Sequence, residues 1–177
     1  VYALAISPAR EDQLVSASGD HTIRVWSLAS GQCTQTLTGH TDGVRSLAIC
    51  PVRGDLLMSG SFDSTIKVWN LDSGQCVRTL AEHALPVYAL VISLRRTAGI
   101  ELISGSNDRK IKVWHVNTRR SSKCVETLDG HTGPVCSLAV SRATDDLLIS
   151  GSTDTTIRLW SLESGLCTSI LTGHTNN

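Results

Sequence analysis

Apolar residues in this chain are grouped into short segments that recur four times in the same order. The first segment of each unit is rich in Val, Ile and Leu and contains no Pro or Gly; its copies begin at Val1, Val44, Val87 and Val135. About eleven residues later, apolar and polar residues alternate in stretches such as TIRVW, which end at Trp26, Trp69, Trp114 and Trp160. Short segments of this kind with a period of two predict strands rather than helices.

Turn-forming residues separate the predicted strands. An Asp precedes each Trp by six residues, at Asp20, Asp63, Asp108 and Asp154. An Asp in a tight turn can accept a hydrogen bond from its own backbone. Ser-Gly pairs after three of the Trp residues predict the next turn, and a further strand such as CTQTL follows. Each unit of about 43 to 48 residues therefore predicts one small antiparallel sheet of four strands.

The third unit is longer than the others. Its additional residues fall in SLRRTAGIEL and VNTRRSSKC. These segments connect the repeated elements, whose internal spacing is the same in all four units, so we expect loops there. These loops contain Arg95, Arg96, Arg119, Arg120 and Lys123. The charges could form a basic patch for an acidic partner, but solvated loop charge is the favoured interpretation.

Composition narrows the possible partners and compartments. In 177 residues, 16 Lys and Arg balance 16 Asp and Glu, which argues against nucleic acid as a partner. No run of apolar residues is long enough for a membrane helix. Six Cys without a CxxC pair predict reduced thiols and hence an intracellular protein, cytoplasmic or nuclear. The chain does not begin with Met, so we expect it to come from a larger protein.

Residue types used in catalysis occur here at repeated positions. Ser, His and Asp recur once per unit, which is typical of a scaffold rather than of one active site. Four of the six His are repeat residues without a second ligand at close spacing. The sequence contains no phosphate-binding loop and no paired carboxylates in a suitable context. We therefore expect no enzyme activity, no cofactor and no metal site.

A GH pair, an S-x-S-x-D segment and a Trp, repeating every 43 residues or slightly more, resemble the WD40 family of β-propellers. The resemblance covers nearly the whole chain. It implies an all-β fold, a partial β-propeller of four antiparallel four-stranded blades at about 1–38, 39–81, 82–129 and 130–172. Residues 173–177 would begin a missing fifth blade. Two departures are that Ser27, Asn70, His115 and Ser161 replace the Asp after Trp, and that Glu82 replaces Gly before a His.

The resemblance also implies a buried hydrogen-bonded network of His, Ser, Asp and Trp in each blade. The complete sets would be His40, Asp63 and Trp69; His83, Asp108 and Trp114; and His131, Asp154 and Trp160. The first blade would retain only Asp20 and Trp26. The Ser could be either of two in each blade, for example Ser59 or Ser61. Open blade faces predict contact with further blades of a parent protein, or self-association of the fragment.

In a propeller of this family, two positions in each blade reach the top face. The residues after the first Val are Tyr2, Arg45, Tyr88 and Cys136, and those before the turn Asp are Gly19, Phe62, Asn107 and Thr153. The only two Tyr and the only Phe of the chain fall among these eight positions. Because aromatic residues and Arg are enriched in interface hot spots, we expect a binding surface there. The alternative is that the aromatic rings pack between neighbouring blades.

The resemblance therefore implies a non-catalytic scaffold that binds a peptide or protein segment on its top face. An alternative is the substrate-recognition WD40 module of a ubiquitin ligase of F-box or RING/TRAF type, since the VYAL and GQCxxTL segments are similar to such domains. Phosphodegron readers among these use several converging arginines, whereas only Arg45 has such a position here. Nucleic-acid binding through the basic loops is the least favoured hypothesis.

Overall fold

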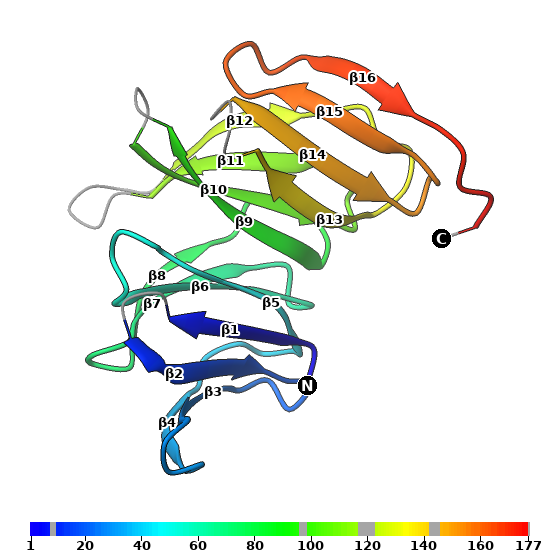
Figure 1. Ribbon diagram of the computed structural model, residues 1–177. Helices are drawn as coiled ribbons and strands as arrows, with labels where there is room; N and C mark the ends of the chain where they lie inside the picture. Colours follow the sequence, from blue (N-terminus) through cyan, green and yellow to red (C-terminus); the bar gives the residue numbers. More distant parts are fainter. Residues whose placement is uncertain (8–9, 96–98, 117–122, 142–145, 177) are drawn as a thin grey trace. The chain divides into compact units, whose positions relative to one another are not determined.

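The computed structural model describes residues 1–7, 10–95, 99–116, 123–141 and 146–176, and all regular structure in these ranges is β-strand. Sixteen strands form four separate antiparallel sheets of four strands each (Figure 1). In every sheet the strands lie side by side in chain order, so each connection is a hairpin. The predicted all-β class with four antiparallel four-stranded sheets is thereby confirmed.

The first two sheets comprise β1 (Ala3–Ser7), β2 (Arg10–Ala17), β3 (Ile23–Ser27) and β4 (Cys33–Leu37), and β5 (Val44–Ile49), β6 (Leu56–Ser61), β7 (Ile66–Asn70) and β8 (Gln75–Leu80). The third comprises β9 (Val87–Arg95), β10 (Gly99–Ser106), β11 (Ile111–His115) and β12 (Lys123–Leu128). The fourth comprises β13 (Val135–Val140), β14 (Leu147–Ser152), β15 (Ile157–Ser161) and β16 (Cys167–Leu171).

The expectation that the additional residues of the third unit form only loops is wrong in part. Arg95 ends β9 and Gly99 begins β10, so this insertion also lengthens a hairpin. Lys123 is likewise the first residue of β12. The other three predicted loop cations, Arg96, Arg119 and Arg120, lie outside the described residues.

The hairpins turn through the residues predicted from the sequence. In the first sheet, the Oδ1 of Asp20 accepts a hydrogen bond from the backbone N–H of Thr22 at 3.0 Å, and the other turn Asp residues do the same. The residue after each Asp has a left-handed backbone, with φ between 66° and 69°. In the next hairpin this conformation is supplied by glycine, for example at Gly31 with φ of 68°. Local turn chemistry therefore sets the register of each sheet.

By its internal contacts the chain divides into two units, Val1–Val87 and Tyr88–Asn177. In the first unit, β5 packs against β1 and β2, and the N–H of Val44 donates to the carbonyl of Ser18 at 3.0 Å. The core of this unit lies between the two sheets. The first sheet contributes Val15, Ala17, Ile23, Val25 and Leu37, and the second contributes Val44, Leu57, Trp69 and Leu71.

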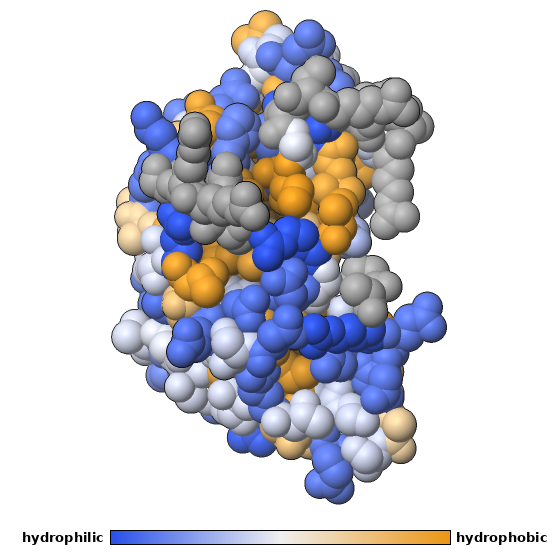
Figure 2. Space-filling model, turned by 90° about the vertical axis from the view of Figure 1, so that its left-hand side faces the viewer, coloured by the Kyte–Doolittle hydropathy of each residue, from blue (hydrophilic) through white to orange (hydrophobic). Residues whose placement is uncertain are grey.

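The second unit repeats this arrangement with its own two sheets. Its core combines Ile103, Ile111, Val113 and Leu128 of the third sheet with Val135, Leu148, Trp160 and Leu162 of the fourth. Trp69 and Trp160 therefore each pack on the sheet that precedes their own. Most side chains on the surface seen in Figure 2 are hydrophilic or neutral, with apolar ones in small groups. This is expected when apolar side chains are buried between consecutive sheets.

Gly105 allows a close approach between the two sheets of the second unit. A Cβ built on Gly105 would lie 2.7 Å from Cγ1 of Val135 and 3.3 Å from its carbonyl oxygen. At Gly151 of the fourth sheet, only Ser137 lies within 4 Å of such a Cβ.

We expect Gly105→Ala to lower the free energy of unfolding by about 1–3 kcal/mol, because Val135 would have to move within a packed core. The measurement is urea unfolding followed by tryptophan fluorescence. Gly151→Ala is the matched control, with an expected change of about 0.5 kcal/mol because the flexible Ser137 side chain can rotate away. Equal losses in the two variants would contradict the close approach at Gly105.

Candidate functional site

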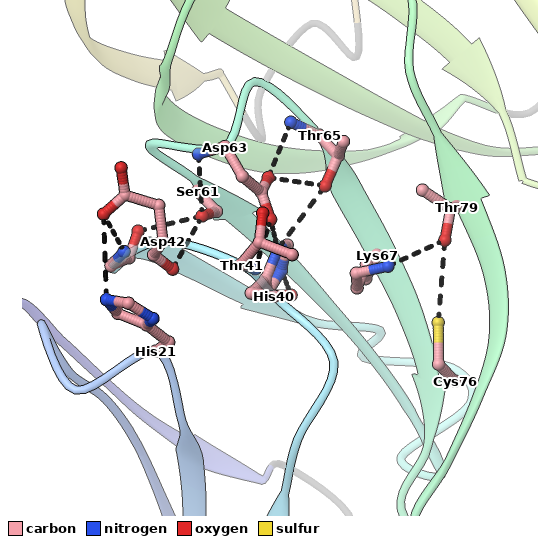
Figure 3. A network of polar contacts seen from close by, with 12 residues as sticks. His21, His40, Thr41, Asp42, Ser61, Asp63, Thr65, Lys67, Cys76 and Thr79 are labelled. Carbon is pink, nitrogen blue, oxygen red and sulfur yellow. Dashed lines mark hydrogen bonds and ion pairs between the residues drawn. The ribbon is translucent and has the colours of Figure 1, made fainter.

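A hydrogen-bonded chain of four side chains links the loop before β5 to strands β6 and β7. His40 Nδ1 lies 2.7 Å from Oδ2 of Asp63, and its Nε2 lies 2.7 Å from Oγ of Ser59. The indole N–H of Trp69 donates to the same Ser59 oxygen at 2.8 Å. Figure 3 shows His40, Thr41 and Thr65 gathered around Asp63. Of the two serines left open by the sequence, Ser59 is the one that joins Trp69 to His40.

The direction of each hydrogen bond follows from the donors available. A carboxylate only accepts, so Nδ1 of His40 carries the hydrogen that faces Asp63. Nε2 is then an acceptor, and the Ser59 hydroxyl donates to it while accepting from Trp69. The side chains of His40 and Asp63 are only 0% and 7% exposed, yet each polar side-chain atom of these four hydrogen-bonded residues has a partner. A fully satisfied network of this kind stiffens the structure around it.

The fourth sheet contains the same arrangement. His131 lies 2.7 Å from Asp154 and 2.8 Å from Ser150, to which Trp160 donates at 2.8 Å. The backbone N–H of Thr132 also donates to Oδ2 of Asp154 at 2.9 Å. The two units thus each contain one complete network between their consecutive sheets.

The other serine of each pair has a different task. The hydroxyl of Ser61 donates to the carbonyl of Gly43 at 2.9 Å and accepts from the backbone N–H of Asp63 at 3.1 Å. Ser152 makes the equivalent bonds to Gly133 and Asp154. This serine therefore ties the hairpin turn to the loop that contains the network His.

The Trp–Ser hydrogen bond is also present in the third and first sheets. In the third sheet Trp114 donates to Ser104 at 2.9 Å, but His83 belongs to the first unit, so its set with Asp108 stays a prediction. In the first sheet Trp26 donates to Ser16 at 2.8 Å, and Asp20 is exposed.

Burial and hydrogen bonding shift the pKa values within the networks. Burial disfavours the imidazolium and lowers the pKa of His40 and of His131, although the adjacent carboxylates act in the opposite direction. Burial also opposes the charged form of Asp63 and Asp154. Hydrogen bonds from the next Thr side chain, the His and two backbone amides outweigh it, so both Asp pKa values lie below the usual range. The network therefore contains a neutral His and an ionised Asp at neutral pH.

The residue after each Trp, where Asp was missing from the sequence pattern, donates to an acid near the start of the second strand. Ser27 donates to Asp12 at 3.1 Å, and Asn70 donates to Asp55 at 3.2 Å. Ser161 donates to Asp146 in the same way at 2.9 Å. We did not predict these pairs from the sequence, although an acid 14 or 15 residues before each donor is a detectable signal.

The third sheet modifies this pair. Glu101 takes the place of the Asp and is completely buried. The guanidinium of Arg95 binds it through two contacts of 2.7 and 2.8 Å, and His115 lies 3.2 Å away. The interpretation of Arg95 as a solvated loop charge is therefore wrong, because this cation neutralises a buried carboxylate.

Three of the residues predicted for the top face lie together in the first unit. The rings of Tyr2 and Phe62 meet edge to face, with centroids 5.7 Å apart and planes at 86°. The guanidinium carbon of Arg45 lies 5.8 Å from the Tyr2 ring centroid. Tyr2 is 50% exposed, whereas Arg45 and Phe62 are more deeply buried. We call Tyr2, Arg45 and Phe62 the aromatic cluster.

Glycines position both rings of the aromatic cluster. A Cβ on Gly19 would lie 3.2 Å from the Tyr2 ring, and a Cβ on Gly43 would lie 3.0 Å from the Phe62 ring. Because Tyr2 belongs to the first sheet and Phe62 to the second, these rings do pack between neighbouring sheets, as the alternative interpretation expected. Tyr2 nevertheless keeps half of its surface open to solvent.

The other predicted binding residues lie in the second unit. Tyr88 and Asn107 are half-buried. Cys136 and Thr153 both line a hollow of about 590 Å³ beside Gly151 and His174. The structure thus brings together Tyr2, Arg45 and Phe62 in the aromatic cluster, and Cys136 and Thr153 at this hollow.

Within the described residues, no three His, Cys, Asp or Glu side chains are close enough to hold a metal ion. All six cysteines are free thiols. The described residues also contain no helix with the length and apolar character needed to cross a bilayer.

We expect Ser59→Ala to lower the free energy of unfolding by about 2–3 kcal/mol, because it leaves the Trp69 N–H without an acceptor and His40 Nε2 without a donor. Urea unfolding followed by tryptophan fluorescence measures this loss. Ser73→Ala, at an exposed turn position, is the control and should change stability by no more than about 0.5 kcal/mol. Similar stability in both variants would show that the network contributes little.

The networks also predict a loss of stability in mild acid. Because the pKa values of His40 and His131 are lower when folded, the unfolded chain binds protons more readily below its own His pKa of about 6.5. The temperature at which half of the chain is unfolded should therefore fall as the pH is lowered from about 7 to 5. Protonation of Asp63 and Asp154 should lower this temperature further below about pH 4.

The combined substitution His40→Asn and His131→Asn should flatten the first part of this profile. His21→Asn, which removes an exposed imidazole outside both networks, is the control. An unchanged slope in the double variant would contradict the assignment.

Comparison with known proteins agrees with this geometry. The sequence model of the family described as WD domain, G-beta repeat, matches residues 1–27, 31–70, 74–115 and 122–161. The later matches each begin close to the last strand of one sheet and end just after the Trp of the next sheet. The complete networks likewise join a His from the loop between two sheets to the Trp of the later sheet. The WD repeat-containing protein pop1 of Schizosaccharomyces pombe is 32% identical over 174 residues, which is 92% of this chain and 21% of pop1. The chain thus spans about a fifth of the length of that relative. Four family matches over four sheets built in the same way show that this chain belongs to the WD40 repeat family.

Proposed function

We propose that this chain is an interaction scaffold that binds an extended peptide or protein segment on the surface around the aromatic cluster. WD40 repeats generally bind proteins or peptides and are generally not enzymes. The single observation that supports this location best is the half-exposed Tyr2 ring, held between Arg45, Phe62 and the backbone of Gly19.

The chemistry of the aromatic cluster fits a peptide ligand. A ring held by its neighbours loses little conformational entropy when a partner covers it, which is why Tyr and Arg are frequent at hot spots. Tyr2 also offers a phenolic hydroxyl, and Arg45 offers guanidinium N–H donors, for the carbonyl groups of an extended segment. The same proposal includes a binding surface of the second unit with Tyr88, Asn107, Cys136 and Thr153. The partner would meet the protein inside the cell, in the cytoplasm or nucleus.

Recognition of a ubiquitin-ligase substrate remains the alternative within this proposal. A phosphorylated segment usually requires several arginines, and in the first unit Arg10 and Arg53 are paired with Asp72 and Asp55. Arg45 is the one arginine of the aromatic cluster. We therefore favour a ligand that does not depend on phosphate.

Tyr2→Ala should weaken binding about tenfold, because truncation of a hot-spot side chain costs about 1–2 kcal/mol. The probes are peptides selected from a random phage-displayed library on the wild-type chain, with affinities measured by fluorescence anisotropy. Tyr88→Ala should weaken them in the same direction. Phosphoserine versions of the same peptides test the alternative, which would be favoured by markedly tighter binding.

The matched control is Val52→Ala, at a 68% exposed apolar residue beyond the opposite end of β5. This variant should bind as the wild type does. Unchanged affinity in a folded Tyr2→Ala variant, or an equal loss in the Val52 control, would contradict the location.

A further inference from the structure

An Asp-Gly pair in the loop between the first two sheets lies beside an exposed imidazole. The N–H of Gly43 donates to Oδ1 of Asp42, the residue before it, at 2.6 Å. Nε2 of His21, from the hairpin between β2 and β3, lies 3.9 Å from the same oxygen (Figure 3). The side chains of His21 and Asp42 are 49% and 58% exposed, so both can move and water reaches them. A backbone nitrogen, a carboxyl group and a proton carrier therefore meet at one point.

The second sheet holds the main chain of this pair in place. The hydroxyl of Ser61 lies 3.1 Å from the carbonyl oxygen of Asp42 and 2.9 Å from that of Gly43. The N–H of Phe62 also donates to the Gly43 carbonyl at 2.9 Å. With the main chain fixed, the carboxyl group of Asp42 stays against the Gly43 nitrogen. Holding two reacting groups together in this way removes part of the entropic cost of the reaction between them.

Packing requires glycine after Asp42. A Cβ at position 43 would lie 3.0 Å from the Phe62 ring and 3.3 Å from Cα of Gly19. Because glycine has no side chain, nothing next to the Gly43 nitrogen shields it from the carboxyl group of Asp42. The close contact of the first two sheets thus keeps the residue that makes this nitrogen most accessible.

The chain contains one other Asp-Gly pair, and its setting is different. Asp129 and Gly130 lie in the loop between the third and fourth sheets, and both are exposed. Oδ2 of Asp129 accepts a hydrogen bond from Nζ of Lys110 at 2.8 Å, so this carboxylate is drawn to an ammonium group. The same two residue types therefore occur once with the carboxyl group directed at the following nitrogen, and once with it bound to a cation.

We propose that Asp42 is a site of covalent modification, where the chain forms isoaspartate through a cyclic imide with assistance from His21. The Gly43 nitrogen loses its proton to solvent and bonds to Cγ of Asp42. One Cγ–O bond then breaks. Its oxygen takes one proton from solvent and one from the imidazolium of His21, and leaves as water. Imidazole is suited to this step because it takes up and releases protons near neutral pH.

Hydrolysis of the five-membered imide completes the reaction. Water that adds at Cγ breaks the new bond to nitrogen and restores Asp42. Water that adds at the former main-chain carbonyl breaks the original peptide bond, and the chain then continues through Cγ as isoaspartate. The former main-chain carbonyl becomes a carboxylate, so the reaction needs no oxidant or other reagent besides water.

Isoaspartate changes the loop on which the aromatic cluster rests. It places one more carbon atom between Cα of Asp42 and the Gly43 nitrogen. The carbonyl groups that now face the Ser61 hydroxyl and the Phe62 N–H are displaced as a result. We therefore expect the modified chain to be less stable than the unmodified one. This inference does not depend on the proposed binding of a peptide.

The experiment is ageing of the folded chain at neutral pH and body temperature, followed by proteolysis. Mass spectrometry with electron-transfer fragmentation distinguishes isoaspartate from Asp. Isoaspartate at Asp42 should form about tenfold faster than at Asp129, through an intermediate lighter by one water. In urea, where the chain is unfolded, the two pairs should react at similar rates. The same ratio of rates in the folded and unfolded chain would overturn the proposal, as would an Asp42 that stays unmodified.

Two substitutions separate the parts of the site. His21→Asn removes the imidazole, and Asn tolerates the left-handed backbone at this position, where φ is 69°. This variant should slow the reaction at Asp42 several-fold and leave that at Asp129 unchanged. His174→Asn, at another exposed His, is the matched control and should change neither rate. Lys110→Ala releases the carboxylate of Asp129, yet Asp42 should still react several-fold faster.

Equal rates at Asp42 and Asp129 in the Lys110→Ala variant would overturn the proposal, because the ion pair alone would then explain the difference. An unchanged rate at Asp42 in the His21→Asn variant would overturn the assistance by the imidazole. Circular dichroism before ageing checks that every variant folds.

Discussion

Burial of apolar side chains between consecutive sheets is the constraint on which the rest of this structure depends. A sheet of four short strands has apolar residues on both faces and is too small to enclose a core of its own. In each unit the core therefore forms where Trp69 or Trp160 and its neighbours meet the preceding sheet. In the second unit, Gly105 lets the two sheets come close enough for Val135 to fill the remaining space.

The polar networks are arranged to serve this packing. His40 and His131 come from loops between two sheets, and each binds an Asp and a Ser of the later sheet. Because the Ser also receives the indole N–H, the large apolar Trp is held at one angle within the core. Tyr2, which precedes β1, takes no part in these networks and is 50% exposed.

Much of this fold could be predicted from the sequence because the determinants are local and repeated. Alternation of apolar and polar residues indicated the strands, and turn residues such as Asp63 and Gly74 indicated the hairpins. The extension of the β9–β10 hairpin and the binding of Arg95 to buried Glu101 were not predicted. They depend on partners in neighbouring strands, and a charged residue in an insertion looks the same whether it is solvated or paired.

The sequence by itself determined that this protein consists of four similar four-stranded sheets, since each turn and each strand is specified by residues within a few positions of one another. Only the tertiary structure decided that Ser59 rather than Ser61 joins the network, since the two serines lie two residues apart on the same strand. It also decided that Tyr2, Arg45 and Phe62 meet. These outcomes depend on which sheet lies against which, and that arrangement is set by packing rather than by local sequence.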